Sequence, residues 1–283
     1  MPAIVRFRRS VLFMPGSNPR ALERAKTLPA DALIFDLEDA VAPDAKDMAR
    51  QTVCDAVRAG GYGKRELIVR VNALTAAWGD ADLAAVATCG AHAVLLPKVE
   101  SAAMVRQVLT LLKAHGAPEH MAVWCMLETP RGILRAEDIA ASPRVAALVM
   151  GTSDLTKELH ARHTRERLPL LPSLGWCLLV GRAYGLTVLD GVHLDLGDDA
   201  GFEYACRQAA DMGFDGKTLI HPTQNHRHRQ PNFCPFTRRP RLGPQDHRRP
   251  RRGHGPGQGS GRGRWPPDRK IACGRGTPHS RTS

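Results

Sequence analysis

The sequence predicts a (β/α)₈ barrel, and three observations lead to this prediction. Short apolar runs recur along residues 1–224, and stretches with helical periodicity separate them. Nearly every run continues directly into polar or glycine-containing residues. The chain is 283 residues long and 43% apolar, which suits one large domain with a buried core.

Eight apolar runs are expected to form the strands. They are residues 10–13, 32–35, 67–71, 93–96, 122–126, 147–150, 187–189 and 217–220. Capping signals mark several of the helices between them. Asn18, Ser101 and Thr129 are expected N-caps, and Pro43 opens a helix that Gly60 ends.

The basic charge of the chain is confined to its last segment. The formal net charge is +12. Residues 225–283 hold 14 Arg and 1 Lys against 2 Asp, so residues 1–224 have a net charge of −1. A nucleic-acid interface on the barrel is therefore not expected. The basic segment lacks regular Arg-Gly spacing and has few aromatic residues, which argues against nucleic acid as a partner there too.

The regular pattern stops after Gln224. Residues 225–283 contain 9 Pro and 9 Gly and almost no aliphatic side chains. We therefore expect a barrel domain at residues 1–224, and at 225–283 a disordered tail in place of the last barrel helix. An out-of-frame reading of a GC-rich coding region would produce such a switch, so our hypothesis is a frameshift near codon 225.

The cysteines and the N-terminus indicate a cytoplasmic protein. Seven cysteines are scattered and none forms a C-x-x-C pair, so no disulfide framework or zinc site is predicted. The apolar run at 11–14 is too short for a signal sequence or a membrane span. We therefore expect no targeting segment and no membrane partner.

Polar residues at the strand ends predict the functional site, because parallel strands of a barrel place their chemistry at one rim. Glu128 and Asp154 follow the fifth and sixth strands, so their carboxylates could meet. Two carboxylates with water and a substrate oxyacid form a site of the kind that Mg²⁺ prefers. Either acid could instead cap a helix.

Arg70 stands inside an otherwise apolar strand and must find anionic partners. It could hold a substrate carboxylate or thioester oxygen and stabilise an enolate. It could also form internal ion pairs with Asp36, Glu38 and Asp39, which follow the second strand. These three acids could order water around a metal or orient Arg70 as outer support, or cap the next helix.

Three further features give weaker signals. The backbone of residues 15–18 precedes a helix and could bind a phosphate or carboxylate. Lys98 could contact a substrate phosphate, although a lysine after a strand is often simply solvated. His221 is placed for acid–base work, but a His-Pro pair at a loop entrance is often structural.

Several motifs together resemble those of the citrate lyase beta-subunit-like family of HpcH/HpaI aldolases. The motifs are RSVLFMPGS at 9–17, DLEDAVAP at 36–43, VRVN at 69–72, LPKVE at 96–100, ETP at 128–130, GTSDL at 151–155 and GFDGKTLIHP at 213–222. The family includes malyl-CoA, methylmalyl-CoA and citramalyl-CoA lyases, within the pyruvate/phosphoenolpyruvate barrel superfamily. The resemblance covers about residues 9 to 224.

The resemblance implies a mechanism and a set of roles. It implies that Glu128 and Asp154 bind Mg²⁺, that Arg70 is catalytic and steadies substrate oxygens, and that residues 36–39 are the family's acidic support. The implied reaction is a reversible Claisen or aldol cleavage of a 3-hydroxyacyl-CoA thioester to an acyl-CoA and an oxoacid. Malyl-CoA thioesterase, oxoacid aldolase and catalytically impaired scaffold remain open alternatives.

The resemblance also implies contacts with the acyl-CoA and with other subunits. Phe13, Ser17, Asn18 and Arg24 lie where relatives contact CoA, with Lys98 as a further substrate contact. Many relatives have Arg at the position of Asn18. Relatives form homo-oligomers, so a trimer or hexamer is expected. They continue past the His-Pro motif into a helix and a lid segment, and this sequence departs from them there.

Overall fold

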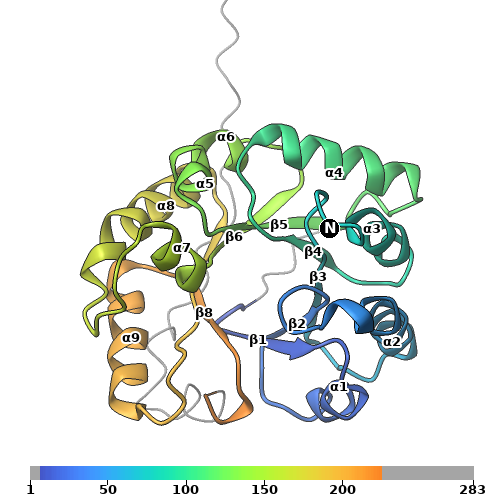
Figure 1. The fold of residues 1–283 in the computed structure, drawn as a ribbon, viewed down its shortest axis with the longest axis horizontal. Helices are drawn as coiled ribbons and strands as arrows, with labels where there is room; N and C mark the ends of the chain where they lie inside the picture. The colour runs from blue at the N-terminus through green and yellow to red at the C-terminus, as the bar shows by residue number, and fades with distance from the viewer. Residues whose placement is uncertain (1–6, 225–283) are drawn as a thin grey trace, which may run out of the picture. The chain divides into compact units, whose positions relative to one another are not determined.

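The computed structural model describes residues 7–224, and these form a closed barrel of eight parallel strands in sequential order (Figure 1). The strands are β1 (Ser10–Pro15), β2 (Ala32–Asp36), β3 (Glu66–Arg70), β4 (Ala93–Leu96), β5 (Ala122–Leu127), β6 (Val145–Met150), β7 (Thr187–Asp190) and β8 (Gly216–Leu219). Each overlaps one of the eight predicted runs, and the (β/α)₈ prediction is confirmed. The predicted tail at 225–283 lies outside the described residues.

Helices connect the strands around the outside of the barrel (Figure 1). They are α1 (Pro19–Ala25), α2 (Lys46–Ala59), α3 (Gly79–Ala87), α4 (Ala102–Ala114), α5 (Pro130–Leu134), α6 (Ala136–Ala140), α7 (Thr152–Glu158), α8 (Leu171–Ala183) and α9 (Asp199–Met212), with 3₁₀ turns η1 (Pro43–Ala45) and η2 (Leu168–Leu170). Within residues 7–224, no helix is long and apolar enough to cross a membrane.

The predicted capping residues begin the helices as expected. The side chain of Asn18 accepts the amide of Ala21 at 3.1 Å, and Ser101 accepts that of Met104 at 3.3 Å. Thr129 caps α5 in the same way. These side chains satisfy amides that have no partner within the helix, so each fixes where a helix leaves the rim.

Alternation along the strands divides the core into two parts. One set of side chains fills the barrel, including Val11, Ile34, Ile68 and the fully buried Trp124. The intervening side chains point outward and form a larger apolar cluster beneath the helices. Because the strand period is two, Asp36 and Arg70 fall on the same inward face as Ile34 and Ile68.

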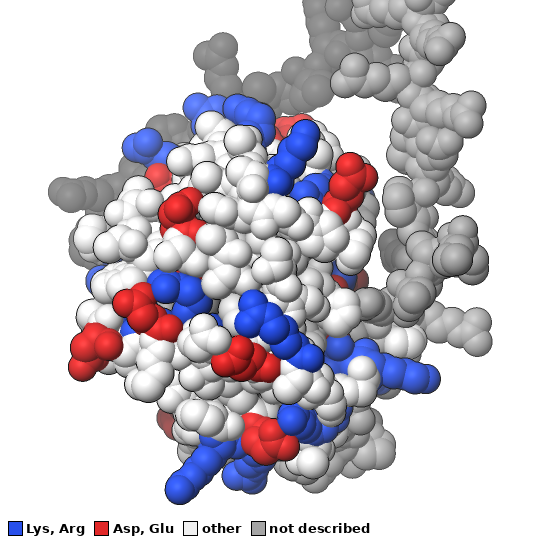
Figure 2. All heavy atoms as spheres, turned by 90° about the vertical axis from the view of Figure 1, so that its right-hand side faces the viewer, with Lys and Arg blue, Asp and Glu red and all other residues white. Residues whose placement is uncertain are grey.

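Acidic and basic side chains are interspersed on the face of the molecule that Figure 2 shows. Both signs lie side by side on this face, and no basic stripe crosses it. This agrees with the nearly neutral charge of residues 1–224.

An ion-pair cluster centred on a buried aspartate joins β7 and β8. Asp190 is fully buried and accepts hydrogen bonds from Lys217 at 2.7 Å and from Arg167 at 2.7 and 2.9 Å. Burial alone would raise the pKa of Asp190, but the attraction of Lys217 and Arg167 outweighs it and lowers that pKa below its ordinary value. A single carboxylate therefore compensates two cations between the sheet and the helices.

We expect Asp190→Asn to lower the free energy of unfolding by about 3–5 kcal/mol at pH 7, because the buried Lys217 and the partly buried Arg167 lose their counter-charge. The pKa of Asp190 is lower in the folded than in the unfolded protein, so ionised Asp190 stabilises the fold at pH values above its unfolded pKa. The difference in stability between wild type and Asp190→Asn should therefore shrink below about pH 4. Urea unfolding at several pH values measures this. The exposed Asp55→Asn is the control, and equal stability of Asp190→Asn and wild type at pH 7 would contradict the prediction.

Candidate active site

Six of the predicted site residues lie at the carboxyl ends of consecutive strands. Asp36 ends β2, and Glu38 and Asp39 follow it; Arg70 ends β3, Lys98 follows β4 and Glu128 follows β5. Asp154 lies in the first turn of α7, after β6. The barrel therefore gathers residues from five successive strand ends at one rim, as the sequence predicted.

Arg70 is held by a two-pronged ion pair with Asp36. The register places the two residues opposite each other on β3 and β2, and two nitrogen–oxygen contacts of 2.6 Å join their side chains. Asp36 also accepts the amides of Glu38 and Ala40 at 2.9 and 3.0 Å. This parallel geometry fixes the plane of the guanidinium.

The remaining edge of Arg70 faces the other acids of the cluster. Its Nη1 lies 2.8 Å from Glu38 and 3.2 Å from Asp39, and its guanidinium lies 5.0 Å from the ring centre of Phe13. Burial opposes the charge of Arg70, but its bonds to Asp36 and the nearby acids raise its pKa further. The internal ion pairs anticipated from the sequence are present, and the guanidinium stays charged.

Lys98 connects the acidic cluster to the other two carboxylates. Its amide donates to Glu128 Oε1 at 2.7 Å, while its ammonium lies 2.9 Å from Glu38 and 3.2 Å from Asp154. The backbone of Lys98 is left-handed, with φ of 49°, a conformation that costs a non-glycine residue free energy and often marks functional sites. One strained residue thus brings three acids together.

Glu128 is buried, and burial raises its pKa to about 7. Its carboxylate fits against Gly151, where any Cβ would overlap the Glu128 side chain. The glycine of the Gly-Thr-Ser-Asp motif therefore lets the end of β6 approach Glu128 closely. The penalty on ionised Glu128 is the kind that a bound cation would relieve.

Glu128 and Asp154 fit a hard divalent cation by ligand type and by their adjacent strand ends. In residues 7–224, no group of three His, Cys, Asp or Glu side chains is arranged to hold a metal. An ion bound by these two carboxylates would take its remaining ligands from water and substrate, as Mg²⁺ commonly does.

Sequence reasoning missed one residue beneath the site. Lys46 of α2 is buried and donates to the carbonyls of Leu37 and Glu38 at 2.8 and 2.7 Å, and to Asn72 Oδ1 at 2.8 Å. Burial lowers its pKa. These three bonds fix the loop that carries Glu38. The only local signal is that Lys46 follows the acidic motif closely in the chain.

Of the predicted CoA contacts, Phe13 lies on β1, Ser17 and Asn18 directly precede α1, and Arg24 lies in the last turn of α1. Ser17 is half-buried, and Asn18 and Arg24 are exposed. The Asn18 side chain is already engaged in its helix cap, whereas Phe13 lies beneath Arg70. Their contact with CoA stays a prediction. His221 is exposed, and its ring bonds to Thr223, so the structure gives it a local partner.

Comparisons with known proteins show which family this chain belongs to. The sequence profile of the HpcH/HpaI aldolase/citrate lyase family matches residues 9–222. That match spans most of the chain. The chain belongs to this family. Members of the family are enzymes, and the predicted resemblance is confirmed.

Two relatives of the HpcH/HpaI family illustrate the similarity. A (3S)-malyl-CoA thioesterase of Cereibacter sphaeroides is 50% identical over 216 residues, covering 76% of this chain and 74% of the relative. The citrate lyase subunit beta of Escherichia coli is 40% identical over 225 residues, covering 77% and 74%.

A solved family structure is also similar. The protein CitE of Mycobacterium tuberculosis, in complex with magnesium, acetoacetate and coenzyme A, superposes with a TM-score of 0.67 at 33% identity. The superposition covers 79% of this chain and 80% of CitE.

We expect Glu128→Gln to stabilise the protein in EDTA at pH 8 by about 2 kcal/mol, because Gln removes the ionisation of a buried acid. Since the folded pKa of Glu128 is raised, wild type should lose stability as pH rises from about 4.5 through 7, and the variant should lose less. Chemical denaturation across pH measures this. The control is the exposed Glu119→Gln, and a destabilised Glu128→Gln at pH 8 would contradict the prediction.

Proposed function

We propose that this chain is a Mg²⁺-dependent enzyme that cleaves a carbon–carbon bond in a 3-hydroxyacyl-CoA thioester, giving an acyl-CoA and an oxoacid. The observation that carries the proposal is the convergence of a fixed Arg70 with Glu128 and Asp154 at one rim. The Mg²⁺ and coenzyme A in the complex of the similar CitE protein support it.

Glu128 and Asp154 are the proposed ligands of the ion. A bound Mg²⁺ would act as a Lewis acid on substrate oxygens and so favour the enolate form of the leaving fragment. Lys98 now bonds to both carboxylates, through its amide and its ammonium respectively. When a cation binds these acids, the ammonium of Lys98 would either move away from Asp154 or share that carboxylate with the cation.

Arg70 is the proposed catalytic cation. Bond cleavage places negative charge on a substrate oxygen, and a preorganised guanidinium stabilises that charge without reorganising. Asp36 fixes its plane, while Glu38 and Asp39 line its other edge. The three acids therefore hold Arg70 in place.

A second candidate function is thioester hydrolysis on the same site. It is favoured by the thioesterase relative, which is 50% identical over 216 residues. Phe13, Ser17, Asn18, Arg24 and Lys98 would contact the acyl-CoA in either case. The two reactions differ in which bond breaks, not in how the residues at the rim are placed.

We further propose that residues 1–224 form the catalytic domain of a cytoplasmic enzyme, with 225–283 as a separate basic tail. The family profile ends at residue 222. Five cysteines of the described part are buried thiols, as suits a reducing compartment.

We predict that Mg²⁺ raises the stability of wild type and that Glu128→Gln and Asp154→Asn abolish this effect. At a concentration one hundred times Kd, the gain should be about 2.7 kcal/mol. Thermal unfolding with MgCl₂ and with EDTA measures it without any need for turnover. Asp55→Asn should retain the full shift. An equal shift in the two carboxylate variants would place the metal elsewhere.

The products distinguish the two candidate reactions. With malyl-CoA or citramalyl-CoA and Mg²⁺, we expect release of an oxoacid without free thiol, detected by phenylhydrazone formation and by a thiol reagent. Free CoA with no oxoacid would instead support the thioesterase.

Arg70→Lys should lower kcat/KM by about 100-fold or more, because lysine cannot reproduce the paired bonds. The exposed Arg58→Lys is the control. If the protein binds Mg²⁺ but forms neither an oxoacid nor free CoA, both proposed reactions are contradicted.

A further inference from the structure

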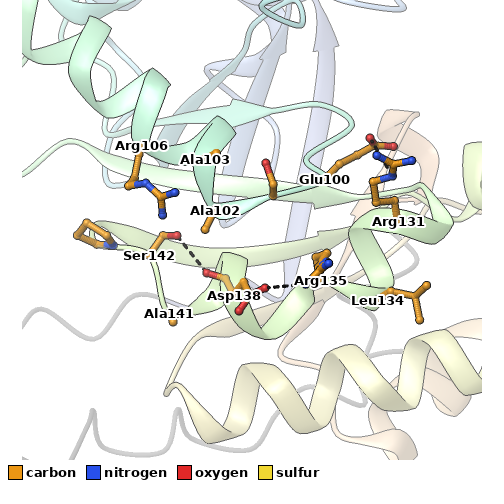
Figure 3. Close-up of a pocket in the computed structure, with 12 residues that line it drawn as sticks. Glu100, Ala102, Ala103, Arg106, Arg131, Leu134, Arg135, Asp138, Ala141 and Ser142 are labelled. Atoms are coloured by element: carbon orange, nitrogen blue, oxygen red, sulfur yellow. Dashed lines mark hydrogen bonds and ion pairs between the residues drawn. The ribbon is translucent and has the colours of Figure 1, made fainter.

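An open groove of about 920 Å³ lies outside the barrel, between α4 and the α5–α6 segment (Figure 3). It contains none of the predicted site residues. Its lining comprises Glu100, Ser101, Ala102, Ala103, Arg106, Arg131, Leu134, Arg135, Asp138, Ala141, Ser142 and Pro143. The surface is therefore apolar in part and carries three arginines against two acids.

Two of the three arginines of the groove form only long ion pairs. Arg131 lies 3.9 Å from Glu100, and Arg135 lies 3.5 Å from Asp138, with most of each arginine side chain exposed. Exposed pairs of this length contribute little. Beside them Leu134 has 79% of its surface exposed. Cations next to an exposed leucine are features of a protein-binding surface.

A second exposed segment of the chain has the opposite character. The loop at residues 194–199, with the sequence Leu-Asp-Leu-Gly-Asp-Asp, lies between β7 and α9 and ends at Asp199, the first residue of α9. Leu194 and Leu196 are 53% and 43% exposed. Asp195 accepts the amide of Gly197 at 2.8 Å, and Asp198 caps α9. The loop thus presents two leucines among three aspartates in a shape held by its own hydrogen bonds.

We propose that the acidic loop 194–199 of one copy of this chain docks into the arginine-lined groove of a second copy. The groove has a net charge of +1 and the loop of −3, so the two surfaces attract. Leu194 and Leu196 would cover the apolar floor of the groove and the exposed Leu134. Burial of these leucines provides the non-polar part of the contact.

The two surfaces lie at different places around the barrel, so the contact is head-to-tail. The groove is lined by residues of α4, α5, α6 and their flanking turns, whereas the loop follows β7. A heterologous contact of this kind builds a ring when the rotation closes. The end of the groove at Glu100 lies beside the rim that carries the site residues, and its other end, at Ser142 and Pro143, precedes β6.

Other occupants of either surface fit less well. The tail at 225–283 carries a net +13 by sequence and would be repelled by the arginines of the groove. The aspartates of the loop do not form a metal site, since no group of three suitable side chains converges within the described residues. The second copy is the partner that matches both surfaces at once.

The test exchanges the charges of the two surfaces in the full-length chain. A groove variant combines Arg131→Glu with Arg135→Glu, and a loop variant combines Asp195→Lys with Asp199→Lys. Molar mass by light scattering during size-exclusion chromatography should show an oligomer for wild type. Each variant alone should dissociate, with affinity weakened at least about tenfold by like charges.

The combined variant, with all four substitutions, should recover the oligomer of wild type. This recovery also excludes local unfolding as the cause of dissociation, and circular dichroism checks each variant for folding. A mixture of the groove and loop variants should associate, because the native groove of one and the native loop of the other attract each other, whereas neither variant should associate alone. The control is Arg58→Glu on α2, which should leave the mass unchanged.

Three results would overturn the proposal. They are a monomeric wild type at concentrations of about 100 µM, single-surface variants with unchanged mass, and a combined variant that does not reassociate. If truncation after Gln224 dissociates the oligomer while the charge variants do not, the tail and not the groove makes the contact.

Discussion

The site depends on keeping one guanidinium buried and charged in the mouth of the barrel. Arg70 occupies an inward position where its neighbours on β3 are apolar. An unpaired cation there would be strongly destabilising. Asp36 on the next strand compensates it through two short bonds, and two backbone amides in turn hold Asp36. The same two amide bonds hold the loop that carries Glu38 and Asp39 next to the end of β2.

The second half of the site is organised by the backbone. Lys98 adopts a left-handed conformation that aims its amide at Glu128 and its ammonium at Asp154. Gly151 allows the next strand end to close on the same carboxylate. Because these contacts bury Glu128, its pKa is raised to about 7, and its charge becomes sensitive to a neighbouring cation. The left-handed backbone of Lys98 and the missing side chain of Gly151 thus set the electrostatics of the proposed metal site.

Charge has separate roles in different parts of the chain. The buried ions of the barrel are paired within it, as Asp190 with Lys217 and Arg167 shows. The exposed arginines of the groove and the aspartates of loop 194–199 are opposite in sign and belong to different surface segments, α4 to α6 and the connection between β7 and α9. Surfaces of this kind favour association between copies, while the net charge of the barrel stays close to zero.

The sequence alone determined the eight strands, the helix caps and the rim positions of Arg70, Glu128 and Asp154. Strand period, capping side chains and residues next to a strand end are local properties, so they can be read from the chain. Only the tertiary structure decided that Asp36 is the main partner of Arg70, that Lys98 joins three acids and that Lys46 supports their loop. It also decided the pKa of Glu128. Those features depend on strand register, barrel closure and burial, which are set by contacts between residues far apart in the sequence.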